Sequence, residues 1–346
     1  MIIVKFGGIV NNLGKEGGRK MDNIDEGTFG ALVCRSEQMK EVCRTIQEIG
    51  NADVTVLIEG ETGVGKKLAA RELHKRNPRR KEKIMGYVDC AAIMPEVIES
   101  ELFGHKKGSF TGSYYDRKGL FEFANGGTIF IDEISNLSPD LQGKLLLVAD
   151  EGKIRPVGAN EYFGVDVRII AASNKNLEDL VRKGEFRADL YWRLNVLPIN
   201  IPPVRERRED INSLASHFMR EFSAKHSKEY RDTADCYTES LNLMKLEGNV
   251  RELRNLIERE LFMPGAIKRV AFSEQRKSVI PTRIDYGSNG KVRPLPEILD
   301  EVKIKYIALA LEEAGGSKTR AAELLGVKRT TLHLMMKQLG IGHSLL

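Results

Sequence analysis

Three glycines and a lysine, spaced between an apolar run and a helical pattern, have the chemistry of a phosphate-binding loop. The glycines of GETGVGK at 60–66 let backbone N–H groups turn inward around an anion, and Lys66 adds a mobile cation. A β-branched run at 54–58 reads as a buried strand, and an Ala- and Leu-rich helix follows the loop. This context predicts a phosphate site, whose residues are Gly60, Glu61, Thr62, Gly63, Val64, Gly65, Lys66 and Lys67.

Two carboxylates end a second apolar run at 127–131. Parallel strands present ligands at their carboxyl ends, so we expect Asp132 to hold Mg²⁺ and Glu133 to polarise an attacking water. Because Lys67 stands where a hydroxyl could reach the metal, the ion must depend on another residue. Ser173 and Asn174 end a further strand and can bond a γ-phosphate or the water, the alternative being an Asx-type turn.

Three arginines could act on transferring phosphoryl groups. Arg187 and Arg193 are six residues apart, close to two helical turns, and could serve a neighbouring subunit's phosphate or form surface ion pairs with Asp189 or Glu185. Arg251 lies in the first turn of a predicted helix, with Asn249 as N-cap and the residue at 252 completing a capping box. A cation there opposes the helix dipole, so we expect an anionic partner.

Glycines at 104, 108 and 112 bracket Phe110 and Thr111 in the stretch 101–116. An aromatic side chain at the tip of such a loop is costly to leave in water, and loops of this kind are commonly contact sites. The alternative is that Phe110 folds back into the core.

The elements that must position these residues indicate an α/β fold. Apolar strands at 54–58, 87–90, 127–133 and 168–174 alternate with helical patterns, and residues 30–52 read as an amphipathic helix. Helical patterns at 210–222, about 236–246 and 249–262 then predict a second, all-α subdomain. The expected order is a flexible tail (1–27), an α/β subdomain (28–204), a helical subdomain (205–271), a polar linker (272–294) and a last helical domain (295–346).

The last domain has the pattern of three helices with a Gly-containing turn, which is typical of a helix-turn-helix. A generic three-helix bundle with a solvated basic face is the alternative. If it binds DNA, the start of each of the last two helices faces bases and phosphates. The candidates are Ser317, which we expect to cap its helix, Lys318, Lys328, Arg329, Thr330, Thr331, His333 and Lys337.

Composition sets wider bounds. The chain has 346 residues and a net charge of +5, a mild basic excess that suits a nucleic-acid partner. The four cysteines show no metal-ligand spacing and read as thiols of a reducing cytosol, so we expect a cytoplasmic protein. No apolar run has the length needed to cross a bilayer, so we expect no membrane partner.

Six motifs occur in the order typical of bacterial sigma-54-dependent transcription activators, and residues 30 onward resemble that family. The motifs are GETGVGK, SELFGHKKGSFTGS, GGTIFIDE, Ser173-Asn174, FRADLYWRLNV and GNVREL. The resemblance implies an AAA+ ATPase that forms a ring hexamer, uses ATP and Mg²⁺, and is followed by a helical lid and a Fis-type helix-turn-helix. It implies double-stranded DNA and sigma-54 RNA polymerase as partners.

The resemblance also implies residue roles. The loop 60–66 would be Walker A, Asp132 with Glu133 Walker B, and Ser173 with Asn174 sensor I. Arg251 would be sensor II, and Arg187 and Arg193 would be arginine fingers acting in trans. The sigma-54 contact would be made by the loop at Gly108, Phe110, Thr111 and Gly112.

The chain departs from the family at several positions. The family's GAFTGA loop reads GSFTGS, Lys67 replaces a usual Glu, and Asp89 replaces an Asn that would orient Glu133. If Asp89 faces Glu133, the two carboxylates repel and one takes up a proton. We also expect control by a protein binding in trans, or by expression level, without an attached receiver domain. The rival hypotheses are a DNA-binding regulator that has lost sigma-54 coupling and an AAA+ remodeller of another protein.

Overall fold

The computed structural model describes residue 24 and residues 27–110, 112–228, 234–271, 294–315 and 317–339. These residues belong to two compact units, Met1–Gln275 and Arg276–Leu346, each of which is described by itself. The expected tail at 1–27 lies outside the described residues except for 24 and 27, and the expected linker at 272–294 lies outside them except for 294. No helix among the described residues is long and apolar enough to cross a bilayer.

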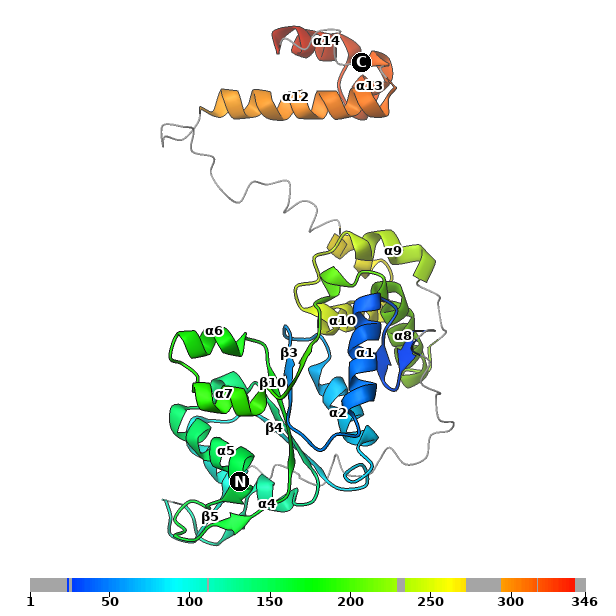
Figure 1. The fold of residues 1–346 in the computed structure, drawn as a ribbon. Helices are drawn as coiled ribbons and strands as arrows, with labels where there is room; N and C mark the ends of the chain where they lie inside the picture. Colours follow the sequence, from blue (N-terminus) through cyan, green and yellow to red (C-terminus); the bar gives the residue numbers. More distant parts are fainter. Residues whose placement is uncertain are drawn as a thin grey trace. The chain divides into compact units, whose positions relative to one another are not determined.

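The first unit contains a five-stranded parallel sheet (Figure 1), which confirms the predicted α/β class. Its strands are β3 (Val56–Glu59), β4 (Met85–Asp89), β7 (Thr128–Asp132), β10 (Arg168–Ser173) and β11 (Leu197–Asn200). They lie in the order β11-β3-β10-β7-β4. Strand β10 therefore lies between β3 and β7, with Ser173 beside Glu59 and Ala171 beside Ile131. This register brings the carboxyl ends of three strands together, next to the loop at 60–66.

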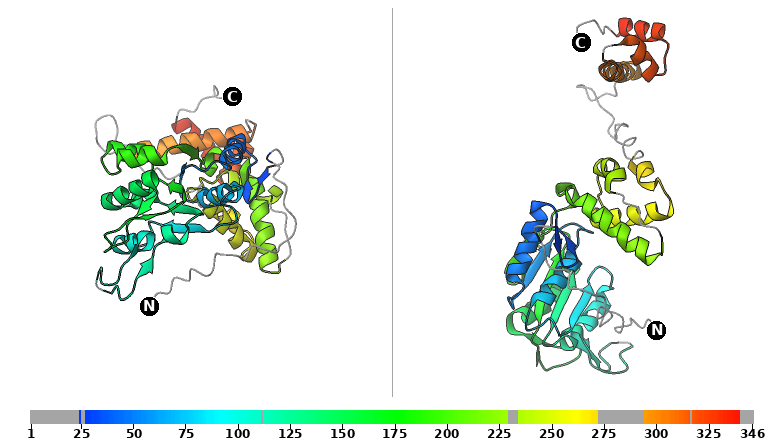
Figure 2. Two further views of the ribbon diagram at one scale, coloured as in Figure 1. Left: turned by 60° about the horizontal axis from the view of Figure 1, so that its bottom comes forward. Right: turned by 90° about the vertical axis from the view of Figure 1, so that its right-hand side faces the viewer.

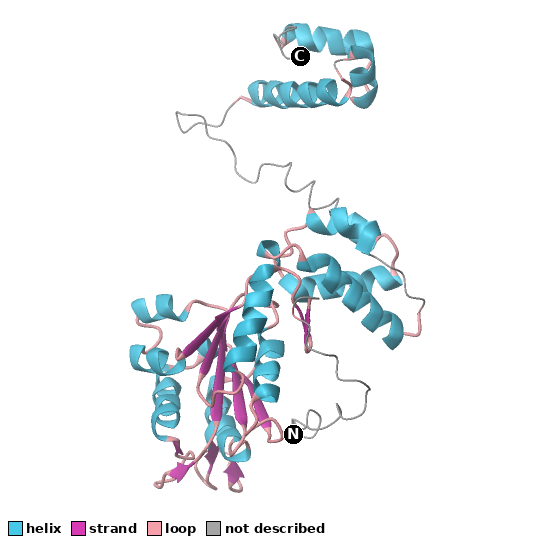
Figure 3. Cartoon of the chain, turned by 45° about the vertical axis from the view of Figure 1, so that its right-hand side comes forward, coloured by secondary structure: helices cyan, strands magenta, loops and turns pink. Residues whose placement is uncertain are grey.

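Helices cover both faces of this sheet, as Figures 1 and 3 show. Alternate side chains of each buried strand point to opposite faces. Val56 and Ile58 pack with the helices α1 (Glu37–Ile49) and α2 (Lys66–Arg76), whereas Leu57 packs with the other face. That second face is covered by α3 (Pro95–Phe103), α4 (Leu120–Phe123), α5 (Pro139–Glu151), α6 (Leu177–Arg182) and α7 (Ala188–Leu194).

Small hairpins and turns complete the α/β part. Before α1, the short strands β1 (Thr28–Phe29) and β2 (Leu32–Val33) pair antiparallel, so the helix expected within 30–52 begins later. Two further hairpins leave the second face. They pair β5 (Gly104–His105) with β6 (Arg117–Lys118) and β8 (Lys153–Ile154) with β9 (Phe163–Gly164). Single turns η1 (Ile134–Asn136) and η2 (Val204–Glu206) follow β7 and β11.

The helical subdomain has its own apolar core. It contains α8 (Asp210–Lys225), α9 (Ala234–Asn242) and α10 (Asn249–Phe262), which gather together in both views of Figure 2. The buried carboxylate of Asp210 accepts hydrogen bonds from the N–H groups of Arg35 (2.6 Å) and Ser36 (2.7 Å). It ties the start of α8 to the segment that leads into α1.

The second unit consists of α12 (Leu295–Glu313), α13 (Lys318–Leu324) and α14 (Arg329–Gln338). Ile307, Ala321, Leu332 and other apolar residues of the three helices form a small core. Gly326 has a φ of 65°, the left-handed conformation that a tight turn between α13 and α14 requires.

Candidate functional site

The loop between β3 and α2 has the backbone of an anion-binding nest. Gly60, Gly63 and Gly65 have φ values of 152°, 85° and 116°, which side-chain-bearing residues rarely adopt. Gly65 is the N-cap of α2 and leaves the first turn of the helix without a side-chain cap. Its backbone N–H groups and helix dipole therefore favour an anion at this point.

Lys66 reaches from the first turn of α2 across this loop. Its ammonium donates to the carbonyl oxygen of Gly60 (2.7 Å) and lies 3.5 Å from Oε1 of Glu133. The side chain is almost fully buried. A single cation is thus held between the loop and the carboxylate at the end of β7.

Glu133 takes a backbone conformation that is rare for a residue with a side chain, with a φ of 53°. Its Oε2 accepts a hydrogen bond from the N–H of Asn174 (3.1 Å), whose side-chain Nδ2 donates to Oγ1 of Thr62 (3.2 Å). Strained residues of this kind cluster at functional sites. The carboxylate is consequently fixed between Lys66 and the end of β10.

Asp132 fits a divalent cation. Its Oδ1 is buried and has no hydrogen-bond partner among the residues that the structure describes, while Oδ2 lies 3.5 Å from the hydroxyl of Tyr87. Burial raises the pKa of Asp132, and the neighbouring Glu133 raises it further. An unpaired buried carboxylate oxygen is costly unless it coordinates a cation.

Lys67 lies over an aromatic ring of the neighbouring strand β4. Its ammonium lies 3.6 Å from the centre of the Tyr87 ring. Burial lowers the pKa of Lys67, with a contribution from Arg71, while Asp132 and Asp89 act in the opposite direction. The register of β4 and β7 places Asp89 beside Asp132, and the Asp89 charge also raises the pKa of Asp132.

Ser173 and Asn174 have different surroundings. The Ser173 hydroxyl donates to the carbonyl oxygen of Lys175 (2.6 Å) and accepts from the N–H of Lys175 (3.1 Å), so it closes a local turn. Ser173 meets the loop through its backbone, since its carbonyl oxygen accepts from the N–H of Gly60 (3.2 Å), whereas Asn174 bonds to Thr62 and Glu133.

The lid helix α10 begins against the phosphate loop. A Cβ atom at Gly63 would lie 2.5 Å from the carbonyl oxygen of Gly248. A cavity of about 660 Å³ opens there. It is lined by both parts of the unit, including Glu61, Thr62, Asn174, Gly248 and Arg251. Arg251 is exposed and forms no ion pair with any residue that the structure describes.

The prediction that Asn249 caps α10 is wrong. Gly248 occupies the N-cap, and its N–H donates to Oε2 of Glu252 (2.8 Å). Asn249 is fully buried at a φ of 54°; its Oδ1 accepts from the N–H of Val204 (2.8 Å) and its Nδ2 donates to Oε2 of Glu61 (3.0 Å). Tertiary contacts with the loop replace the local cap, and no sequence signal indicates them.

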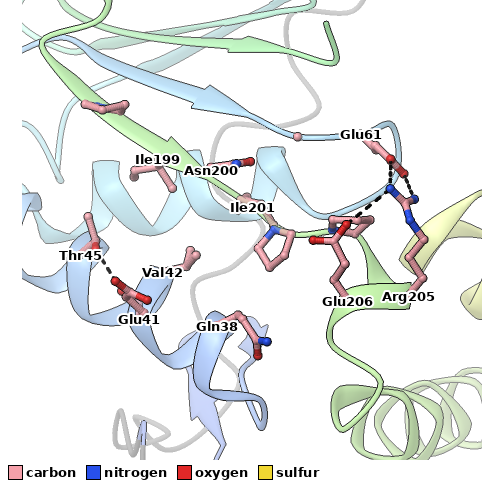
Figure 4. A pocket seen from close by; sticks show the side chains of 14 residues that line it. Gln38, Glu41, Val42, Thr45, Glu61, Ile199, Asn200, Ile201, Arg205 and Glu206 are labelled. Carbon is pink, nitrogen blue, oxygen red and sulfur yellow. Dashed lines mark hydrogen bonds and ion pairs between the residues drawn. The ribbon is translucent and has the colours of Figure 1, made fainter. Parts of the chain in front are cut away.

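A second cavity, of about 550 Å³, lies beside the first residues of the same loop (Figure 4). It is lined by α1, β11 and the segment after β11. Arg205 donates two hydrogen bonds to the carboxylate of Glu61, at 2.7 and 2.8 Å, and holds the pKa of Glu61 below its usual range. Val64, at the other end of the loop, accepts through its carbonyl oxygen from Nη2 of Arg207 (2.8 Å).

Arg187 and Arg193 lie away from this loop, at the two ends of α7. Arg187 pairs with Asp189 (2.7 Å) and Arg193 with Asp150 (2.8 Å), and both side chains are about half exposed. Within the described residues, neither has a hydrogen bond or ion pair with the phosphate loop. The arrangement leaves them accessible to another molecule.

Phe110 lies at the tip of the segment between β5 and β6. The ring is 47 % exposed and contacts the His105 ring edge-on, with 4.9 Å between centroids, so it does not fold into the core. Gly108 and Gly112 flank it with φ values of 81° and 104°. Thr111 lies outside the described residues.

In the second unit, α13 and α14 expose most of the predicted DNA-binding side chains. Ser317 occupies the N-cap of α13, as predicted, although its side chain makes no capping hydrogen bond with a described residue. Leu332 and Met336 turn inward. The polar candidates on the remaining surface of these helices are Lys318, Lys328, Arg329, Thr330, Thr331, His333 and Lys337, of which Lys318 and Thr331 are half-buried.

Comparisons with known proteins agree with this arrangement. Residues 32–200 match the sigma-54 interaction domain, residues 205–273 the AAA+ ATPase lid domain, and residues 299–339 the bacterial regulatory protein, Fis family. The regulatory protein AtoC of Escherichia coli is 38% identical over 90% of this chain and 68% of its own length. The Nif-specific regulatory protein of Klebsiella pneumoniae is 41% identical over 86% of this chain and 56% of its own.

Among solved structures, NtrX from Brucella abortus in complex with ADP superposes with a TM-score of 0.66 at 30% identity, over 89% of this chain and 70% of that one. The fold and the site therefore define a P-loop AAA+ ATPase with a helical lid. The chain belongs to the sigma-54-dependent transcription activators, which confirms the resemblance seen in its motifs.

Proposed function

We propose that this protein assembles into a ring and binds DNA through its second unit. It uses ATP hydrolysis between protomers to remodel the closed complex of sigma-54 RNA polymerase. The observation that carries the proposal is the convergence of Lys66, Glu133 and Asn174 at adjacent strand ends beside a glycine-rich loop. Such an arrangement holds a triphosphate and a water in fixed positions.

The residues of the site divide the chemistry. The N–H groups of residues 60–66 and the Lys66 ammonium bind the phosphates, and Glu133 accepts a hydrogen bond from the attacking water and orients it. Asn174 keeps Glu133 in place. Asp132 would hold Mg²⁺, which neutralises phosphate charge when bound.

Arg251 and the two α7 arginines complete the proposed site. Arg251 lines the cavity at the lid and has no ionic partner in the described residues, so it suits the phosphates of the same protomer. Arg187 and Arg193 are exposed and do not contact their own loop, so they suit the nucleotide of a neighbouring protomer. Such a site is complete only in a ring, for which we propose a hexamer.

The proposed contact with sigma-54 is the tip at Gly108, Phe110, Thr111 and Gly112. Its support is the half-exposed Phe110 ring on a loop with two glycine hinges, in a domain that matches the sigma-54 interaction domain. For DNA we propose the polar surface of α13 and α14, since this unit matches the Fis family. A protein that binds in trans would regulate the ring.

The decisive experiment is in vitro transcription from a sigma-54 promoter with ATP and with a nonhydrolysable analogue. We expect open complexes with ATP and none with the nonhydrolysable analogue. Glu133→Gln should bind ATP but lose hydrolysis by at least about a hundredfold, because the water is no longer oriented. Asn176→Ala is the matched control, because Asn176 follows the adjacent strand β10 and its side chain accepts from the N–H of Asp179 in the first turn of α6 (2.9 Å).

ATP hydrolysis without sigma-54-dependent transcription would favour a remodeller of another protein. Transcriptional effects without hydrolysis would favour a DNA-binding regulator that has lost the coupling. DNA binding itself should weaken steeply with rising salt, because each phosphate contact releases counterions. A flat salt response would contradict DNA as a partner.

A further inference from the structure

The tip of the loop between β5 and β6, which carries Phe110, is closed by its own hydrogen bonds. The N–H of Gly108 donates to the carbonyl oxygen of Ser113 (2.8 Å), and the N–H of Ser113 donates to that of Phe110 (3.0 Å). These bonds draw residues 108–110 and 112–113 together, with both glycines in left-handed conformations. The turn leaves nearly half of the Phe110 ring exposed.

The hydroxyl of Ser113 adds two bonds to this turn. It donates to the carbonyl oxygen of Phe110 (2.7 Å) and accepts from the N–H of Phe110 (3.0 Å). Ser113 is itself buried beneath the tip. Both polar groups of the Phe110 backbone are thus bonded to one buried side chain, which an alanine could not do.

Ser109, the other serine of the GSFTGS motif, behaves differently. Its hydroxyl is buried and has no hydrogen-bond partner among the described residues. Its Cβ lies close to Gly158, since a Cβ added at Gly158 would meet it at 2.6 Å. Alanine would keep that Cβ. Of the two serines, only Ser113 holds the tip through its hydroxyl.

A second set of contacts supports the Phe110 ring from behind. The His105 ring that it touches is buried, and Nδ1 of His105 lies 2.6 Å from the hydroxyl of Ser100 in α3. The N–H of Lys106 donates to the carbonyl oxygen of Val157 (2.9 Å), which joins the base of the loop to the β8–β9 hairpin. The ring therefore has a rigid inner side and a free outer side.

We infer that Ser113 is a positioning residue, whose hydroxyl fixes Phe110 in one orientation before the partner binds. A fixed aromatic anchor loses less conformational entropy on binding than a mobile one, so the hydroxyl raises affinity for the partner. This rests on the proposed function for the identity of the partner. The bonds of the Ser113 hydroxyl organise the exposed ring without covering it.

The test compares Ser113→Ala with Ser109→Ala in the full chain. Binding to sigma-54 is measured by fluorescence anisotropy in the presence of ADP and aluminium fluoride. We expect Ser113→Ala to weaken binding about tenfold, since two hydrogen bonds no longer order the tip. Ser109→Ala should match the parent. In a Phe110→Ala background, Ser113→Ala should have no further effect, which a merely structural role would not produce.

Amide hydrogen exchange over 108–113 gives an independent readout. Exchange should accelerate in Ser113→Ala and not in Ser109→Ala, whether or not sigma-54 binds. If the parent binds no sigma-54, the proposed function fails while the exchange result still decides the role of Ser113. Unchanged exchange, or tighter sigma-54 binding by Ser113→Ala, would overturn the inference.

Discussion

At the scale of single residues, the site shows a charge arrangement that the family pattern does not have. Asp89 adds a carboxylate beside Asp132, and Lys67 adds an ammonium over the neighbouring Tyr87 ring. The pKa of Tyr87 is raised to about 12, first by burial and then by these carboxylates. The two substitutions thus offset each other around one proposed metal ligand.

This offset can be tested with a double-mutant cycle. Lys67→Glu alone places a further carboxylate beside Asp89 and Asp132, and we expect it to lower the ATPase rate at least about tenfold. Adding Asp89→Asn should restore much of that rate, because the excess negative charge is removed. Steady-state ATPase measurements on the two single variants and the double variant decide the matter. Purely additive effects would show that the two positions act separately.

At the scale of elements, one arginine fastens the opposite end of the sheet. Arg80, which is almost fully buried, bonds to the carboxylates of Asp53 and Asp166 and to the carbonyl oxygen of Gly127 (2.6 Å). These partners precede β3, β10 and β7. A single side chain thereby fixes the starts of three adjacent strands, whose other ends carry the site.

The ion pair predicts a pH-dependent contribution to stability. The hydrogen bond from Arg80 holds the pKa of Asp53 below its ordinary value. The stabilisation is therefore complete above about pH 4, the unfolded value, and is lost as the pH falls through the folded one. Asp53→Asn should cost about 1–3 kcal/mol at pH 7, and less as the pH falls below about 4.

Urea unfolding of the parent and Asp53→Asn across this pH range measures the difference. Asp166→Asn is the matched control, because it removes a more exposed partner of the same arginine and should cost less. A constant difference at all pH values would mean that the ionised form of Asp53 is not what stabilises the fold.

Asn249 gives a second prediction at this scale. Asn249→Ala leaves the buried N–H of Val204 without its partner. Alanine also keeps the strain of a side chain at positive φ but loses the hydrogen bonds that offset it. We expect a loss of about 2–4 kcal/mol. Asn249→Gly also removes the hydrogen bonds, but glycine adopts the positive φ without strain. It should therefore cost about 1 kcal/mol less than Asn249→Ala. Calorimetric melting of the two variants separates strain from hydrogen bonding, and parent-like stability of Asn249→Gly would contradict the role of the bonds.

These cases show what the sequence can predict. The phosphate loop follows from local spacing, because the strand, glycines and helix are contiguous, and the α/β class follows from runs of β-branched residues. Asn249 and Ser113 are different. Asn249 has a local role that its neighbours make plausible, yet it bonds to residues far along the chain, and Ser113 differs from Ser109 only in where its hydroxyl points. Such distinctions depend on tertiary geometry that no pattern encodes.

At the scale of the whole molecule, the proposed ring requires residues of one protomer to act in another. Glu133 follows β7 and lies beside Lys66 of the nucleotide loop, whereas Arg193 lies on α7 and pairs with Asp150. We expect Glu133→Gln and Arg193→Ala to be inactive separately. An equal mixture should regain about a quarter of the ATPase rate, because that fraction of interfaces combines an intact Glu133 with an intact Arg193.

The control mixture is Glu133→Gln with Lys66→Ala, whose losses fall on the same side of an interface. It should regain nothing, since no interface then has a complete loop and an intact Glu133. Equal recovery in both mixtures, or none in either, would contradict action in trans by Arg193.

The approach of Gly63 to the start of α10 has a further consequence. A Cβ atom added at Gly63 would meet the carbonyl oxygen of Gly248 at 2.5 Å and the Cβ of Arg251 at 3.1 Å. Any shift of the loop must therefore push or release α10, the helix that carries Arg251. Chemistry at the phosphates thus has a steric path to the helical subdomain. The methyl group of Gly63→Ala would push α10 away from the loop. It would show how far the helical subdomain can tilt before turnover stops.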